Sequence, residues 1–222
     1  MRVAIAGAGA VGRSVARELI GNGHQVLLID KAASAMKPER VPDAEWLLAD
    51  SCELSSLEEA KLESCDVVIA ATGDDKVNLV TSLLAKTEFA VPRTVARVNH
   101  PNNEWLFSEA WGVDVNVSTP RIMSALVEEA VTVGDIVRLF TFRQGNSNLV
   151  ELTLPDDSPY IGKPVGLIPW PDNTALVTIL RDGQVYTPTG EQPIEAGDEL
   201  LFVSGSESES ELQDLLSPGT GE

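Results

Sequence analysis

The sequence feature that most constrains the fold is a glycine pattern near the start, GAGAVG, which contains Gly7, Gly9 and Gly12. An apolar run over Val3–Ala6 precedes the pattern, and apolar residues at helical spacing follow it. Between a strand and a helix, the first glycine permits a tight turn, the second lets a pyrophosphate approach the backbone, and the third lets the helix pack closely on the strand. The free amides at the helix N-terminus then face the phosphates. The pattern therefore predicts a Rossmann-type nucleotide site rather than a structural glycine turn.

An acidic residue in the right place supports this prediction. A second apolar run over Val26–Ile29 ends on Asp30, which follows Gly12 by 18 residues. A carboxylate at the end of the second strand accepts hydrogen bonds from ribose hydroxyls and repels a 2'-phosphate. The sequence therefore favours NAD(H), or another adenine nucleotide such as ADP or ATP, over NADP(H).

Composition excludes several other classes of protein. With 43% apolar and 23% charged residues, the chain of 222 residues is typical of a globular protein that buries a sizeable core. Its net charge of −18 argues against a nucleic-acid partner, which would require a basic face. Its apolar runs fall short of the roughly 20 residues of a membrane span, and Met1 leads directly into the first strand, so we expect a cytosolic protein without a signal peptide. Cys52 and Cys65 lack metal-ligand spacing, and we expect reduced thiols.

The first part of the chain alternates apolar runs typical of buried parallel strands with helical patterns. Beyond the first two strands, the predicted strands are residues 46–49, 66–71, 94–98 and 113–117, and the predicted helices are 53–63, 75–86, 102–110 and 120–133. This alternation predicts an α/β fold with a Rossmann-like, doubly wound parallel sheet, whose ligand crevice lies at the carboxyl ends of the strands.

After Gly134 the pattern changes to short strands separated by turns. The predicted strands are residues 137–142, 149–154, 175–181, 185–187 and 199–203. Asp182-Gly183 between two of these strands favours a type I' hairpin turn. We therefore predict a nucleotide-binding domain over residues 1–134 and a second, smaller α+β domain over residues 135–222.

The nucleotide site is predicted from the glycine turn and from the polar residues that follow the other strands. It comprises Gly7, Gly9, Ala10, Val11, Gly12, Asp30, Lys31, Asp50, Ser51, Thr72, Gly73 and Arg97. The fork of donors on Arg97 suits a phosphate, and the alternative for this residue is a surface ion pair. The alternative for Asp50, and for Asp75 nearby, is helix capping.

Catalytic groups are missing from the pattern, so we predict no catalytic residue and no metal ligand. The second domain offers neither His nor Cys, and His24 and His100 are expected in loops of the first domain. A Walker A lysine and a nucleophile elbow are also absent from the sequence. The sequence therefore favours a binding module over an enzyme. The alternatives are a small NAD-dependent oxidoreductase and a structural scaffold with a vestigial site.

Motifs in both domains resemble the RCK family, the regulators of potassium conductance, in its TrkA-type form. The matching motifs are VAIAGAGAVG, AATGDDKVNL and VARVNHP in the first domain, and DDSPYIGKPV, LVTILRDGQVYTPTG and IEAGDELLFVSG in the second. The chain departs from the family pattern at Ala49-Asp50-Ser51-Cys52, where Gly-Asp-Ala-Thr is frequent. It also departs in the glycine loop. Some members of the family carry an Arg inside this loop, whereas this chain has Ala10 there and its Arg13 comes only after Gly12.

The resemblance implies a cytosolic regulatory subunit of a Trk-type potassium uptake system, in which nucleotide occupancy gates the membrane transporter. Such a subunit would lie at the inner face of the plasma membrane, held there by its transporter partner. It would also form a homo-oligomer, or a hetero-oligomer with a sister RCK subunit. We expect the contact to use the helix over residues 120–133, because it is apolar on more than one face at Ile122, Met123, Leu126, Val127, Val131 and Val133. The alternative is burial of this helix between the chain's own two domains.

Overall fold

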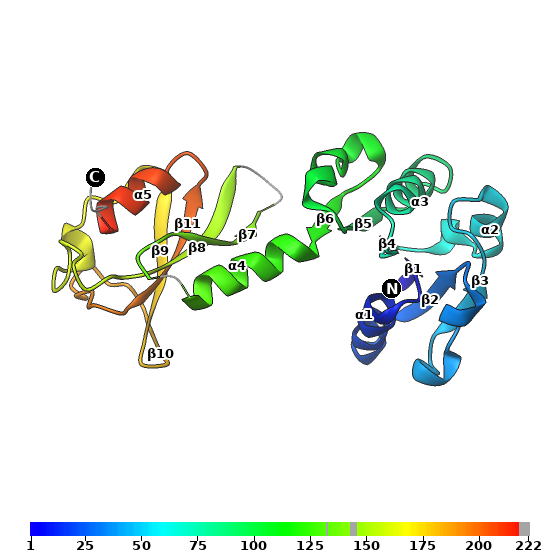
Figure 1. The fold of residues 1–222 in the computed structure, drawn as a ribbon, viewed down its shortest axis with the longest axis horizontal. Coiled ribbons are helices and arrows are strands. Elements are labelled where there is room, and N and C mark those ends of the chain that lie inside the picture. Colours follow the sequence, from blue (N-terminus) through cyan, green and yellow to red (C-terminus); the bar gives the residue numbers. More distant parts are fainter. Residues whose placement is uncertain (132, 143–145, 218–222) are drawn as a thin grey trace. The chain divides into compact units, whose positions relative to one another are not determined.

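The computed structural model describes residues 1–131, 133–142 and 146–217, and the chain divides into two compact units (Figure 1). The first unit is Met1–Pro120 and the second is Arg121–Glu222. The helix α4 (Thr119–Val131) is thereby grouped with the second unit. The predicted boundary near Gly134 lies beyond this helix and stays a prediction.

The first unit contains a six-stranded parallel sheet in the order β3-β2-β1-β4-β5-β6, which confirms the predicted doubly wound fold. Its strands are β1 (Arg2–Ala6), β2 (Gln25–Asp30), β3 (Glu45–Leu48), β4 (Val67–Ala70), β5 (Arg93–Val98) and β6 (Val115–Ser118). Its α-helices are α1 (Ala10–Gly21), α2 (Leu54–Glu59) and α3 (Asp75–Thr87).

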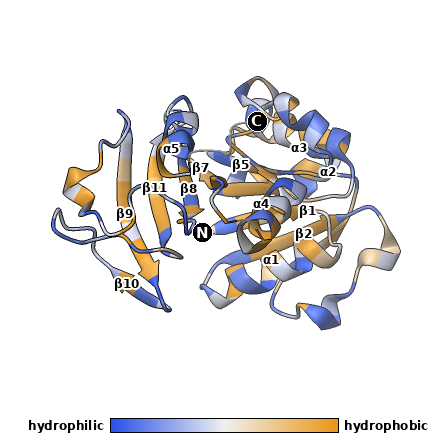
Figure 2. Ribbon diagram, turned by 60° about the vertical axis from the view of Figure 1, so that its left-hand side comes forward, coloured by the Kyte–Doolittle hydropathy of each residue, from blue (hydrophilic) through white to orange (hydrophobic). Residues whose placement is uncertain are grey.

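Apolar residues on both faces explain why the sheet is buried between helices. Ile5 and Leu28 pack on one face together with Ala16 of α1. Ala4 and Leu27 pack on the other face, in a cluster that includes residues of α2. Figure 2 shows hydrophobic residues along the strands and hydrophilic residues on the outer surfaces of the helices. Strands that are covered on both faces have continuous runs of apolar residues in the sequence, as residues 3–6 and 26–29 do here.

The prediction of a helix over residues 102–110 was wrong. The segment forms two 3-10 turns, η4 (Pro101–Leu106) and η5 (Glu109–Trp111). Gly112 ends the second turn with φ of +69°, and a side chain there would lie 2.8 Å from the carbonyl oxygen of Ser82. The chain must turn sharply at this close approach to α3 in order to enter β6, so a regular helix has no room.

The helix predicted over residues 53–63 is also shorter than expected. It consists of α2 and a separate 3-10 turn, η3 (Leu62–Ser64). Lys61 between them adopts a left-handed conformation with φ of +53°. This break lets Leu57 and Leu62 both reach the same buried cluster, and packing therefore overrides helix periodicity.

The second unit contains a five-stranded antiparallel sheet in the order β10-β9-β11-β8-β7. Its strands are β7 (Val137–Thr141), β8 (Ser147–Thr153), β9 (Thr174–Arg181), β10 (Gln184–Tyr186) and β11 (Glu199–Gly205). Asp182 and Gly183 have φ of +50° and +73°, as the predicted type I' turn requires. One face of the sheet packs Phe202 against Leu212 and Leu216 of α5 (Glu209–Leu216).

Candidate nucleotide-binding site

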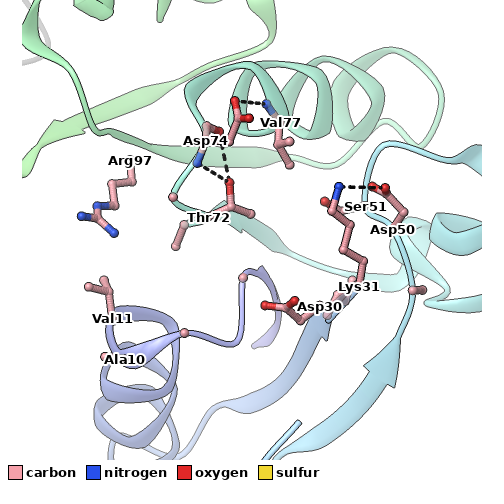
Figure 3. Close-up of a pocket in the computed structure, with 16 residues that line it drawn as sticks. Ala10, Val11, Asp30, Lys31, Asp50, Ser51, Thr72, Asp74, Val77 and Arg97 are labelled. Atoms are coloured by element: carbon pink, nitrogen blue, oxygen red, sulfur yellow. Dashed lines mark hydrogen bonds and ion pairs between the residues drawn. The ribbon is translucent and has the colours of Figure 1, made fainter. Parts of the chain in front are cut away.

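A pocket of about 550 Å³ opens at the carboxyl ends of the parallel strands in the first unit (Figure 3). This volume lies within the usual range for small-molecule sites. Of the predicted site residues, all except Gly12 line the pocket. Residues that line it without having been predicted are Ile29, Ala49, Ala71, Asp74 and Val77. Four of these five lie beside predicted site residues, within the segments 49–52 and 70–79, and their apolar or helix-capping side chains gave no sign of contact with a ligand.

The three glycines of the turn have different physical tasks. Gly7 has φ of +106°, and a side chain there would lie 2.8 Å from the carbonyl oxygen of Ala71. At Gly12 a Cβ atom would lie 1.9 Å from the carbonyl oxygen of Gly7, so this residue serves packing and not the pocket. A Cβ at Gly9 would meet nothing within 4 Å. Gly9 also precedes α1 without providing a side-chain cap, and the first amides of the helix face the pocket uncapped.

Asp30 is held at the end of β2 by two backbone amides. One carboxylate oxygen accepts a hydrogen bond from Ala8 N at 2.8 Å, and the other accepts one from Ala32 N at 2.9 Å. A carboxylate has about four acceptor positions, so acceptor capacity remains for ribose hydroxyls. Arg13 donates to the carbonyl oxygen of Ala8 and thus braces its own turn.

Lys31 and Asp50 form an ion pair of 3.3 Å at one end of the pocket (Figure 3). The backbone amide of Cys52, together with Lys31, lowers the pKa of Asp50 below its usual value. The Asp50 carboxylate accepts a hydrogen bond from Cys52 N at 3.0 Å in a local turn before α2. The N-cap of α2 is Glu53, so the helix-capping alternative does not hold for Asp50. The Ser51 hydroxyl lies 2.9 Å from that of Thr81.

Arg97 lies at the opposite end of the pocket from the Lys31–Asp50 pair (Figure 3). Its Nε atom is buried, and in the described part of the chain it has no hydrogen-bond partner. Among the described residues Arg97 also forms no ion pair, so the alternative of a surface ion pair finds no support there. A buried donor without an acceptor is costly. The donors of Arg97 and the bare turn at Gly9 fit the phosphate groups of an adenine nucleotide.

Asp74 and Asp75 have separate tasks at the start of α3. Asp74 is the N-cap, and its carboxylate accepts from Lys76 N at 2.9 Å. Asp75 is buried and does not cap the helix. It accepts from Asn99 N at 2.7 Å, His100 N at 3.1 Å and Asn103 Nδ2 at 2.8 Å. Asp74 therefore caps α3, and the helix-capping alternative does not hold for Asp75. Asp75 instead ties the start of α3 to the segment that follows β5.

The Asp75 contacts predict a loss of stability in acid. Burial acts to raise the pKa of Asp75, but the hydrogen bonds from Asn103, Asn99 and His100 outweigh it and lower the pKa. A folded pKa below the unfolded value of about 4 gives stability that is present above that value and lost as pH falls through the folded pKa. Urea unfolding at several pH values between 7 and 3 should show Asp75→Asn losing less free energy of unfolding on acidification than the native chain. The control is Asp74→Asn, because Asn also caps helices well; equal acid sensitivity in all three proteins would contradict the assignment.

Comparisons with known proteins decide the family. Two family models match the chain: the TrkA-N domain over residues 3–119 and the TrkA-C domain over residues 149–217. The Trk system potassium uptake protein TrkA of Mycobacterium tuberculosis (strain ATCC 25618 / H37Rv) is 62% identical over 218 residues, covering 98% of this chain and 99% of that protein. This chain belongs to the TrkA family. The expected resemblance is thereby confirmed.

Other members of the TrkA family differ in length. The Trk system potassium uptake protein TrkA homolog of Archaeoglobus fulgidus is 28% identical over 221 residues, which cover 98% of this chain and 50% of that protein. Among solved structures, the GsuK channel bound to NAD matches with a TM-score of 0.68 at 17% identity, covering 100% of this chain and 39% of that one. At this identity the match shows the fold, a Rossmann-like unit joined to a smaller second domain.

The described residues of this TrkA-family chain have three further properties. Within these residues, every helix is too short or too polar to cross a bilayer. No three His, Cys, Asp or Glu side chains of the described ranges are grouped as metal ligands would be. Cys52 and Cys65 are free thiols, and burial raises the pKa of both.

Proposed function

We propose that this chain is a regulatory subunit of a Trk-type potassium uptake system that binds NAD(H), or ADP or ATP, and gates a membrane transporter. The observation that carries the proposal is the pocket itself. It combines the open turn at Gly9, the fixed carboxylate of Asp30 and the cationic side chain of Arg97, which lines the pocket. These groups suit the phosphates and ribose of an adenine nucleotide. The NAD bound to the structurally similar GsuK channel supports the dinucleotide among these ligands.

Asp30 favours nucleotides that carry a free ribose 2'-hydroxyl. Its two carboxylate oxygens are oriented by Ala8 N and Ala32 N, so the charge cannot turn away from the ribose. A 2'-phosphate beside this carboxylate would be repelled. NADP(H) is therefore expected to bind more weakly than NAD(H).

The pocket lining supports binding rather than turnover. Among the described residues that line it, the titratable groups are Asp30, Lys31, Asp50, Asp74 and Arg97. Lys31 and Asp50 are paired with each other, and Asp74 caps α3. Asp30 is assigned to the ribose, and the guanidinium of Arg97 stays protonated and cannot act as a base. The lining therefore offers no group for general acid or base catalysis beside a nicotinamide. The rival proposal is a small NAD-dependent oxidoreductase. It predicts that NADH is consumed steadily in the presence of carbonyl substrates, and the absorbance of NADH, followed over time, would reveal this turnover.

The partners follow from family membership and from an exposed helix. The relatives belong to Trk potassium uptake systems, which supports a membrane potassium transporter as partner and a place at the inner face of the plasma membrane. On α4, apolar residues are exposed to solvent, with Met123 62%, Leu126 55% and Val127 60% exposed. An apolar helix face of this extent needs a cover. A second copy of the chain, or a sister RCK subunit, is the proposed cover.

A nucleotide panel tests the binding function directly. NAD, NADH, ADP and ATP should each raise the melting temperature, because a ligand at 100 times its Kd stabilises the folded state by about 3 kcal/mol. NADP should raise it less. If none of the five raises the melting temperature, the proposal fails and a scaffold with a vestigial site is favoured. Potassium flux in vesicles that contain the transporter, with and without nucleotide, would test gating.

Asp30→Ala should weaken NAD and ADP binding by about 1 to 3 kcal/mol, the scale of lost charge-assisted hydrogen bonds. Isothermal titration calorimetry gives the affinity. Asp43→Ala is the matched control, because Asp43 is an exposed acid outside the pocket. An unchanged affinity for Asp30→Ala would remove Asp30 from the site, and an equal loss for both variants would point to a general charge effect.

A further inference from the structure

A buried asparagine lies directly behind the pocket wall. Asn78 of α3 is fully buried and does not line the pocket. Its Oδ1 accepts from Thr72 N at 2.9 Å and from the Thr72 hydroxyl at 2.6 Å. Its Nδ2 donates to Thr72 O at 3.2 Å and to Arg97 O at 2.8 Å. One side chain therefore uses its whole hydrogen-bonding capacity on two residues of the pocket.

These contacts begin where the backbone ladder stops. The β4 and β5 strands are paired from Val67 and Arg93 as far as Ala70 and Ala96. Thr72 and Arg97 lie beyond the last pair of β4 with β5, although Arg97 is still paired with Val117 of β6. Beyond this point side chains join the two segments. Asn78 bonds both Thr72 and Arg97. Asn99 Nδ2 also donates to Thr72 O at 3.1 Å. Asn78 is the bridge that contacts both pocket residues.

The bridged residues lie at one end of the pocket. Arg97 stands opposite the Lys31–Asp50 pair, and Asp30 lies between them (Figure 3). If Asp30 takes the ribose, as in the proposed function, Arg97 and Thr72 face the phosphate side of the ligand. A change in the spacing of Thr72 and Arg97 would then affect the phosphates and leave the nucleoside contacts in place.

We infer that Asn78 is a positioning residue that holds Thr72 and Arg97 at the spacing required by the phosphate groups of an adenine nucleotide. It acts through these two residues and does not touch the ligand. The inference rests on the proposed function and adds a determinant of ligand choice: the discrimination between a nucleotide and its nucleoside.

The test compares ADP with adenosine by calorimetry on the full chain. Asn78→Asp keeps the size and the acceptor but places an oxygen against the carbonyl oxygens of Thr72 and Arg97. Asn78→Ser, which is too short to bridge them, is the second variant in case the first does not fold. Each should lose about tenfold or more in ADP affinity, as expected for a displaced charged donor, and keep adenosine affinity within about twofold.

Two controls separate positioning from general stability. Ser82→Ala alters another fully buried polar side chain of α3, whose hydroxyl donates to Asn78 O at 2.8 Å, and should leave the ratio of ADP to adenosine affinity unchanged. Arg97→Ala should lower the same ratio, and adding Asn78→Asp to it should lower the ratio less than Asn78→Asp does in the native chain, because the contribution made through the Arg97 side chain is already lost.

Equal losses of ADP and adenosine affinity in both Asn78 variants would overturn the inference, since they indicate a merely structural role. An unchanged ADP affinity in both variants would overturn it as well. A native chain that binds neither ligand would instead refute the proposed function, so the two failures are distinguishable.

Discussion

Gly9→Val should abolish nucleotide binding while leaving the fold intact. Gly9 has an ordinary φ of −67°, and a Cβ atom there would meet no other atom within 4 Å. The protein therefore tolerates the side chain, which instead fills the space where the phosphates approach the backbone. We expect a loss of at least about 100-fold in NAD and ADP affinity, equal to about 2.7 kcal/mol or more. Calorimetry measures the affinity, and circular dichroism with thermal melting checks the fold.

Two other glycines of the same region serve as controls for Gly9→Val. Gly21→Val adds the same side chain at the end of α1, where a Cβ also meets nothing within 4 Å, and should bind normally. Gly12→Ala should instead prevent folding, because its Cβ would lie 1.9 Å from the carbonyl oxygen of Gly7. Normal binding by Gly9→Val would refute the assignment of the glycine turn to phosphate binding.

Leu126→Glu should convert an oligomer into monomers. We expect light scattering at micromolar concentration to give the native chain at least twice its mass of 23.8 kDa. Leu126 is 55% exposed and lies among other exposed apolar residues of α4, so an apolar contact between copies would bury it. Burying a leucine contributes about 1.5 to 3 kcal/mol, and an unpaired carboxylate in its place costs more, twice over in a symmetric dimer.

Ala125→Glu is the matched control for Leu126→Glu. Ala125 is a half-buried residue of α4, and the residues one turn away from it include the charged Arg121 and Glu128. This variant adds the same charge on the charged side of the helix, and its mass should match that of the native chain. A monomeric native chain would contradict the proposed assembly, and equal dissociation by both variants would remove α4 as its specific surface.

Local sequence determined much of the fold and the chemical character of the pocket. The glycine turn, the apolar strands and Asp30 predict a strand–turn–helix–strand unit, and the structure has that unit. Asp182-Gly183 predicts its hairpin because positive φ at both positions is a local property of these residues. The strand-end residues meet in one pocket because parallel strands present their carboxyl ends at the same edge.

The tertiary structure alone decided features that depend on partners distant in the chain. Asp75 has the sequence context of a helix cap, but its partners are Asn99, His100 and Asn103, which β5 brings beside it. Likewise, the 3-10 turns replace the helix predicted over residues 102–110 because Gly112 must approach α3. Asn78 looks like an ordinary polar residue in a helical pattern, and only the ends of β4 and β5 reveal its task. Sequence periodicity records which face of an element is buried, whereas a buried hydrogen bond between strand ends depends on the packing of the whole unit.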